Sequence, residues 1–123
     1  MTVAAIAVAG ALGALARYAV GGLVADRAHG VFPWGTLVVN VSGSLVLGFL
    51  FVLLTERLLP HPTLRIALTV GFLGAYTTFS TFSLETLRLI QDGAVGIAAM
   101  NVFGSVAAGL VAVYLGWVVG RAM

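Results

Sequence analysis

The sequence predicts an all-α membrane protein with four transmembrane helices, the third of them broken, in a single domain over residues 1–123. The 123-residue chain is 61% hydrophobic and only 8% charged, whereas about a quarter of the residues of a soluble domain are charged. The sparse charges also leave four runs that each supply the ~20 apolar residues needed to cross a bilayer. The expected helices cover roughly residues 3–25, 34–54, 64–90 and 95–119.

The composition also limits the chemistry available to the chain. It has no cysteine, and its two histidines, His29 and His61, fall in expected loops. We therefore expect no disulfide, no thiolate metal site and no enzyme. Six arginines and no lysine are scattered singly along the chain, which argues against nucleic acid as a partner. The first apolar run has no basic segment before it and continues into a full span, so we expect no cleaved signal.

The first helix, roughly 3–25, combines a surface of small residues with one charge inside the span. Ala9 and Gly13 are four residues apart, which lets a neighbouring helix approach the backbone closely. Arg17 falls within the span, where an arginine must reach the headgroups, pair with an acid or face water. Arg17 is therefore a candidate for a polar vestibule, with snorkelling to the headgroups as the alternative.

The second and fourth helices carry the same polar pattern. Asn40-x-x-x-Ser44 recurs as Asn101-x-x-x-Ser105, each followed by a glycine four residues on. The same offset relates a Gly-x-Leu-Gly-Ala segment of the first helix to one of the third. This repetition predicts a tandem duplication of a two-helix unit, with the second and fourth helices pointing the same way. An amide inside a span needs a hydrogen-bonding partner, so both asparagines either hold helices together or line a polar path.

The stretch Gly71–Ser83 makes the third helix a poor one. Two glycines three residues apart precede a run of Ser, Thr and Tyr hydroxyls. Glycine lacks the Cβ that restrains the chain, and Ser and Thr hydroxyls compete for backbone hydrogen bonds. Irregular backbone at membrane depth is tolerated only where it is buried in protein or lines a wet cavity, so we expect a break there. Further along, Glu85 and Arg88 are three residues apart, a spacing that predicts an ion pair.

The arginines do not favour one orientation in the membrane. Arg57, Arg65 and Arg121 fall on one side of the expected bundle, and Arg27 and Arg88 fall on the other. Orientation follows the excess of Lys and Arg on the cytoplasmic side, and this distribution gives almost no excess. We therefore expect dual topology, with a single orientation set by a weak bias as the alternative, and an antiparallel homodimer as the closed assembly that two opposed copies form.

The polar groups inside the spans suit a small anion better than a cation. They are amides, hydroxyls and one arginine, with no central carboxylate, and donors without fixed negative charge favour anions. Phe79 and Phe82 are three residues apart and put two rings on one helical face. The positive edges of these rings could replace part of an anion's hydration shell. Simple packing is the alternative role for the pair.

Together these motifs resemble the Fluc (CrcB) family of fluoride channels. The resemblance rests on Gly71-Phe-x-Gly-x-x-Thr-Thr-Phe-Ser-Thr-Phe-Ser83, with Asn40-x-x-Gly-Ser44, Asn101-x-x-Gly-Ser105 and Arg17, and it extends over all four helices. It implies an antiparallel, dual-topology homodimer in the inner membrane of a prokaryote. Such a dimer exports fluoride passively through two pores, each lined by both subunits.

The resemblance also implies the site residues. In the family, phenylalanines of the broken helix and an asparagine of the second helix line the pores, and motif hydroxyls form a polar track. The candidate pore-lining residues here are Asn40, Phe79, Ser80, Thr81 and Phe82. Backbone carbonyls at the break hold a structural sodium ion at the dimer centre, and motif position assigns these carbonyls to Gly74 and Thr77. Vestibular or structural roles pass to Arg17, Glu85, Asn101 and Ser105.

One residue departs from the family pattern, and two other functions suit four short helices. Family members often carry adjacent glycines at the break, where this chain has Gly74-Ala75; we expect the break to survive with altered backbone angles. A small dual-topology multidrug or cation exporter would need a carboxylate deep in the membrane, whereas Glu85 lies near a helix end. A non-transporting membrane assembly subunit would use its polar residues only to hold helices together.

Overall fold

The computed structural model describes residues 1–123 and contains the four predicted membrane-spanning segments. They are α1 (Thr2–Arg27); α2 (Trp34–Val52), which continues into the π-helix η1 (Leu53–Arg57); a composite third span (Pro62–Gln91); and α6 (Val95–Ala122). The third span consists of α3 (Pro62–Ile66), the π-helix η2 (Ala67–Leu73), α4 (Gly74–Tyr76) and α5 (Phe79–Gln91). The prediction of an all-α fold with a broken third helix is confirmed, and the last helix runs to Ala122, slightly beyond its expected end.

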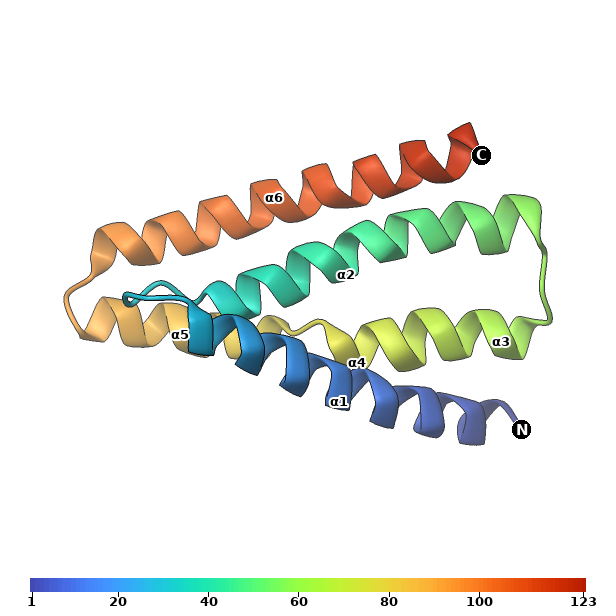
Figure 1. Cartoon of the computed structure of the whole chain (residues 1–123), viewed down its shortest axis with the longest axis horizontal. Helices are drawn as coiled ribbons and strands as arrows, with labels where there is room; N and C mark the ends of the chain where they lie inside the picture. Colours follow the sequence, from blue (N-terminus) through green and yellow to red (C-terminus); the bar gives the residue numbers. More distant parts are fainter.

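At the end with the termini the spans appear in the order α6, α2, third span and α1, and toward the other end α1 crosses the third span and also contacts α2 (Figure 1). The third span runs in the same direction as α1, and α6 in the same direction as α2, so both chain termini lie at one end of the bundle. The common direction of the second and fourth helices is the one predicted. At the end with the termini, the hydroxyls of Thr2 and Thr63 are 3.1 Å apart and join α1 to α3.

Glycines allow α1 to pack closely against the third span. A Cβ on Gly13 would collide with the backbone of Phe72, and a Cβ on Gly71 would lie only 3.0 Å from the Cβ of Ala9. Backbones approach this closely only where side chains are absent or small. The small-residue surface predicted around Ala9 and Gly13 is therefore the surface through which α1 packs.

A second glycine-lined contact joins α2 and α6. A Cβ on Gly48 would collide with the carbonyl of Val113, and a Cβ on Gly116 would collide with the carbonyl of Leu45. The two helices thus meet backbone to backbone along much of their length. Such contacts provide dispersion energy in a membrane, where burial of apolar surface between helices provides little.

The interior of the chain is small and its outer surface is apolar. Only 18 of 123 residues are buried, and the central cluster consists of Val39, Leu73 and Tyr76. Large hydrophobic side chains along all four spans are exposed, for example Leu15 at 64% and Leu110 at 65%. An apolar exterior of this extent fits lipid or another protein chain.

The helix break lies further along the chain than its glycines. Gly74 has helical dihedral angles of φ −63° and ψ −35°, and Gly71 lies within η2. The backbone becomes extended only at Thr77 and Thr78. The expectation that the glycines themselves unwind the helix is wrong: Gly71 serves close packing, and the break is made by two threonines.

Candidate functional site

The break consists of two extended residues between α4 and α5. Thr77 has φ −80° and ψ 159°, and Thr78 has φ −150° and ψ 122°. Both threonine hydroxyls bond to the adjacent half-helices. The Thr77 hydroxyl donates to the carbonyl of Leu73 over 3.0 Å. The Thr78 hydroxyl oxygen accepts from the Thr81 N–H over 3.2 Å and so caps the start of α5.

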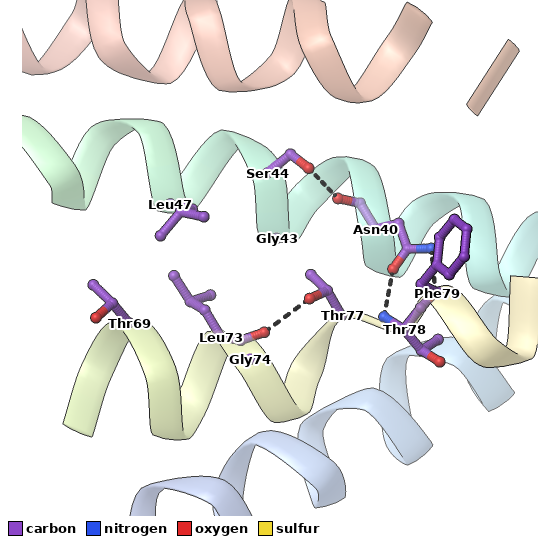
Figure 2. Close-up of a pocket in the computed structure, with 10 residues that line it drawn as sticks. All are labelled: Asn40, Gly43, Ser44, Leu47, Thr69, Leu73, Gly74, Thr77, Thr78 and Phe79. Carbon is purple, nitrogen blue, oxygen red and sulfur yellow. Dashed lines mark hydrogen bonds between the residues drawn. The ribbon is translucent and has the colours of Figure 1, made fainter. Parts of the chain in front are cut away.

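Asn40 of α2 holds the break in place (Figure 2). Its side-chain Nδ2 donates to the Thr78 carbonyl over 2.9 Å, and its Oδ1 accepts from the Thr78 N–H over 2.7 Å. This carbonyl and this N–H are the two main-chain polar groups of Thr78, and neither has a partner within a helix. An unpaired backbone group at membrane depth is costly, so the amide of Asn40 replaces the hydrogen bonds that the broken helix gives up.

Gly43, one turn further along α2, makes room for the break. A Cβ at this position would collide with the Thr77 Cγ2 methyl and would lie 3.1 Å from Cδ1 of the Tyr76 ring. Thr77 cannot easily turn away, because its hydroxyl is bonded to the preceding turn. The Asn40-x-x-Gly-Ser44 motif therefore combines a clamp for Thr78 with space for Thr77.

A cavity of about 290 Å³ lies beside the break, between α2 and the third span (Figure 2). It is lined by Asn40, Gly43, Ser44, Leu47, Thr69, Leu73, Gly74, Thr77, Thr78 and Phe79. No lining residue is charged, and most carry a hydroxyl, an amide or an accessible backbone. Such a cavity can accommodate a small ion through hydrogen-bond donors and carbonyl oxygens without a fixed countercharge.

The rings of Phe79 and Phe82 begin α5 directly after the break. Their centroids are 5.7 Å apart with an interplanar angle of 42°. Phe79 lines the cavity and is 79% exposed in the isolated chain. Within the chain this ring has the Phe82 ring as a neighbour, and most of its remaining surface is open to the cavity, to lipid or to another chain.

The carbonyl of Gly74 is left without its usual helical donor. In a continuous helix the N–H four residues on would bond to it, but the Thr78 N–H donates to Asn40 and the Thr77 N–H donates to Leu73. Gly74 is exposed beside the cavity. Carbonyls freed at the end of a broken half-helix are the oxygen ligands that hold sodium in transport proteins, so this donor set fits the predicted ion.

A second, larger cavity of about 530 Å³ opens at the end of the bundle opposite the termini. Arg17, Thr36, Thr78, Thr81 and Glu85 are among its lining residues. It therefore reaches from Thr78 of the break to residues that include an arginine and a glutamate. Arg17 lies in this vestibule, as one of its two predicted roles requires.

The predicted Glu85–Arg88 ion pair does not form. Glu85 instead points toward α2, where its Oε1 accepts from the Thr36 hydroxyl over 2.9 Å, and its buried Oε2 has no hydrogen-bond partner. The one salt bridge in the structure joins Glu56 and Arg121. The i, i+3 spacing predicted the wrong partner for Glu85, because Thr36 lies on another helix and the local sequence does not show which helices come into contact.

Asn101 and Ser105 of α6 lie away from the break. Asn101 is 1% exposed and donates through Nδ2 to the Thr86 hydroxyl over 2.9 Å. Its Oδ1 accepts from Ser105 over 3.2 Å. Both repeated asparagines thus bond to the third span, but Asn101 bonds to intact helix rather than to the break.

The structure brings some of the candidate residues together and leaves others apart. Asn40, Gly74, Thr77 and Phe79 line the cavity beside the break. Thr81 lines the vestibule, and Ser80 is exposed on α5. Sequence reasoning missed Thr78, although a threonine directly before an apolar helical run is a recognised helix-start signal.

Comparison with known proteins places the chain among one group of relatives. The family model described as "CrcB-like protein, Camphor Resistance (CrcB)" matches residues 4–117. A protein of Magnetococcus marinus is 50% identical over 121 residues, which cover 98% of this chain and 98% of its own length. A protein of Solibacter usitatus is 50% identical over 116 residues, covering 94% and 95%, and one of Opitutus terrae is 53% identical over 114 residues, covering 90% and 86%. All three relatives are named "Fluoride-specific ion channel FluC".

Proposed function

The chain belongs to the CrcB-like family, and from this premise we propose that it is a channel that conducts fluoride passively across the membrane. It is a multi-pass membrane protein and not an enzyme. The relatives that share about half of its residues over nearly its whole length are named for fluoride. A bacterial inner membrane fits these properties.

The observation that carries this proposal is the uncharged cavity, lined in part by an amide and by hydroxyl-bearing side chains, beside the Asn40–Thr78 clamp. Fluoride is small and strongly hydrated, so a narrow path must supply several short-range donors at once. The cavity is lined by the Asn40 amide, whose second N–H has no hydrogen-bond partner in the chain, and by the Phe79 ring, whose edge could face an anion. The hydroxyls of Ser44, Thr69 and Thr77 donate to main-chain carbonyls of the preceding turn and must rotate to donate to an ion. The cavity holds no carboxylate that would repel an anion.

A second copy of the chain is part of the proposal. The cavity beside the break is open on one side, and Phe79 at its edge is 79% exposed. A twofold-related copy covers this face and supplies the missing wall. Because the two copies are equivalent, each copy completes the cavity of the other, which gives two pores per dimer.

The charge distribution supports an antiparallel arrangement of the two copies. Arg57, Arg65 and Arg121 lie at the end that holds the termini, and Arg27 and Arg88 lie at the opposite end. Arginine bias sets orientation during insertion, and this bias is nearly zero. Both orientations therefore enter the membrane in comparable amounts, and opposed copies are available to pair.

A structural sodium ion at the centre of the dimer completes the proposal. The carbonyls of Gly74 and Thr77 from each copy supply its oxygen ligands. The support for this assignment is that Gly74 is exposed beside the cavity and that the N–H groups of Thr77 and Thr78 bond elsewhere, which leaves its carbonyl without a helical donor. A cation fixed there raises the local potential and lowers the cost of an anion in the nearby pores.

Efflux from liposomes tests the function. Purified protein is reconstituted into liposomes loaded with potassium fluoride, and valinomycin starts passive efflux that a fluoride electrode records. We expect rapid fluoride release and strong exclusion of chloride in a parallel experiment. Protein that is folded and reconstituted but releases no more fluoride than empty liposomes would rule the function out.

A further inference from the structure

The Tyr76 side chain is buried directly before the break and does not line the cavity. Tyr76 is the last residue of α4, is 9% exposed and belongs to the central cluster with Val39 and Leu73. Its ring is stacked on Phe72, with centroids 6.2 Å apart and an interplanar angle of 7°. Packing alone explains the ring but leaves its hydroxyl to be satisfied inside the membrane.

The hydroxyl of Tyr76 is satisfied by α2. Its oxygen lies 2.9 Å from the hydroxyl oxygen of Ser42. Ser42 in turn donates to the carbonyl of Val39 over 3.2 Å. Since a serine has a single hydroxyl proton, Tyr76 is the donor to Ser42. The chain of donors runs from the tyrosine through the serine to the main chain of α2.

This chain of hydrogen bonds and the Asn40 clamp bracket the break from its two sides. Tyr76 precedes the extended residues Thr77 and Thr78, and its partner Ser42 lies two residues after Asn40 on α2. One turn of α2 therefore fixes both ends of the same short extended segment. The Asn40 amide holds Thr78, and the Tyr76–Ser42 bond holds the residue directly before the segment.

We propose that Tyr76 and Ser42 are positioning residues for conduction: their hydroxyl pair sets the orientation of the extended segment that carries the Thr77 and Thr78 backbone groups into the cavity. This inference rests on the proposed channel function. The pair touches no ion and acts through the backbone, so its removal changes how the break is held without removing any cavity-lining group. The ring of Tyr76 remains in a phenylalanine variant, which isolates the hydroxyl.

Local hydrogen exchange and fluoride efflux test the proposal on full-length protein in liposomes. In Tyr76→Phe, amide exchange of a peptide covering residues 77–81 should be about fivefold faster than in wild type, the factor expected for loss of one hydrogen bond. Peptides from α6 should exchange at the wild-type rate. Fluoride efflux per folded protein should fall about twofold or more, since small displacements of positioning groups lower rates.

Three further variants sharpen this test. Ser42→Ala should reproduce the Tyr76→Phe result, and the double variant should be no worse than either single one, because both remove the same interaction. Thr63→Val removes a hydroxyl pair of similar length between α1 and α3, far from the break, and should leave exchange at residues 77–81 and efflux unchanged. Tyr114→Phe controls for a tyrosine whose hydroxyl has no hydrogen-bond partner in the chain.

The measured exchange and efflux rates distinguish a positioning role of the hydroxyl pair from a purely structural one. Exchange at residues 77–81 and efflux that both stay at wild-type values in Tyr76→Phe would overturn the proposal. Faster exchange spread evenly over all helices, with normal efflux, would assign the hydroxyl to general stability and overturn it as well. Additive effects in the double variant would show that Tyr76 and Ser42 act independently, and would overturn the proposal that they act as a pair. Wild-type protein that conducts no fluoride would instead reject the channel function, whereas the exchange result stands independently of conduction.

Discussion

The side-chain amide of Asn40 is bonded to the main chain of Thr78 in both directions, as Nδ2 to O over 2.9 Å and as N to Oδ1 over 2.7 Å. This is the pattern by which one strand residue pairs with another, built here from a side chain. It allows two residues to leave the helix at membrane depth with their polar groups satisfied. The same amide keeps one N–H for the cavity, so support of the break and contact with an ion are functions of one residue.

Replacing Asn40 with alanine should disable conduction while the four spans still form. The substitution leaves the N–H and the carbonyl of Thr78 unpaired, at a cost of about 1–3 kcal/mol for each group. We expect fluoride efflux per folded protein to fall at least about tenfold, which corresponds to about 1.4 kcal/mol. Efflux close to the wild-type rate, from protein of normal elution volume, would show that the clamp is dispensable.

Gly43→Ala should destabilise the protein through Thr77. The new Cβ would collide with the Thr77 Cγ2 methyl, and overpacking of this kind costs about 1–3 kcal/mol. The second-site change Thr77→Ser removes that methyl and keeps the hydroxyl that bonds to Leu73, so it should restore most of the lost stability, while the 3.1 Å contact with the Tyr76 ring remains. The measurement is the temperature at which the detergent-solubilised protein loses its monodisperse elution peak.

Gly104→Ala is the matched control for Gly43. Gly104 also lies in a helix, but nothing lies within 4 Å of an added Cβ there. Alanine favours a helix over glycine by up to about 1 kcal/mol, so this variant should be as stable as wild type or slightly more stable. Equal destabilisation by Gly43→Ala and Gly104→Ala would contradict the steric explanation.

Phe79→Ile and Phe82→Ile should each slow fluoride efflux without disrupting assembly. Isoleucine keeps the side chain apolar but has no ring edge to replace an anion's hydration. Phe103→Ile is the control, since Phe103 is 75% exposed on α6 and lines neither cavity. If efflux is unchanged in both test variants, or falls as far in Phe103→Ile, the two rings serve packing only.

The sequence predicted the architecture better than the break. Hydropathy and sparse charge fix the four spans, because the bilayer imposes one length on each of them. The glycines and hydroxyls of Gly71–Ser83 correctly indicated a break, but its position at Thr77 and Thr78 depends on Asn40, a residue of another helix. Glu85 similarly found its partner on α2 rather than one turn away. Partners across helices depend on packing and have no signature in a local pattern.

A reporter fused to the C-terminus should be detected on both faces of the membrane. The nearly balanced arginines at the two ends give no strong orientation bias. Paired fusions, one active only in the cytoplasm and one active only outside it, measure the two populations. Changing Arg57 and Arg65 together to glutamine should shift the ratio toward one face. A wild-type signal confined to a single face would contradict dual topology.

Gly74→Ala should leave the folding of the single chain unchanged and should weaken the dimer. Within the chain, an added Cβ at Gly74 meets nothing closer than the Thr69 carbonyl oxygen at 3.8 Å, an ordinary contact, and the helical angles of Gly74 suit alanine. A methyl group at this exposed position points instead toward the proposed second copy and the sodium ion. We therefore expect normal amounts of inserted protein, a larger monomer fraction in detergent and reduced efflux. Exchange of sodium for N-methylglucamine should weaken the wild-type dimer in the same way. A variant that dimerises and conducts normally, together with a wild-type dimer indifferent to sodium, would place the subunit interface and the ion elsewhere.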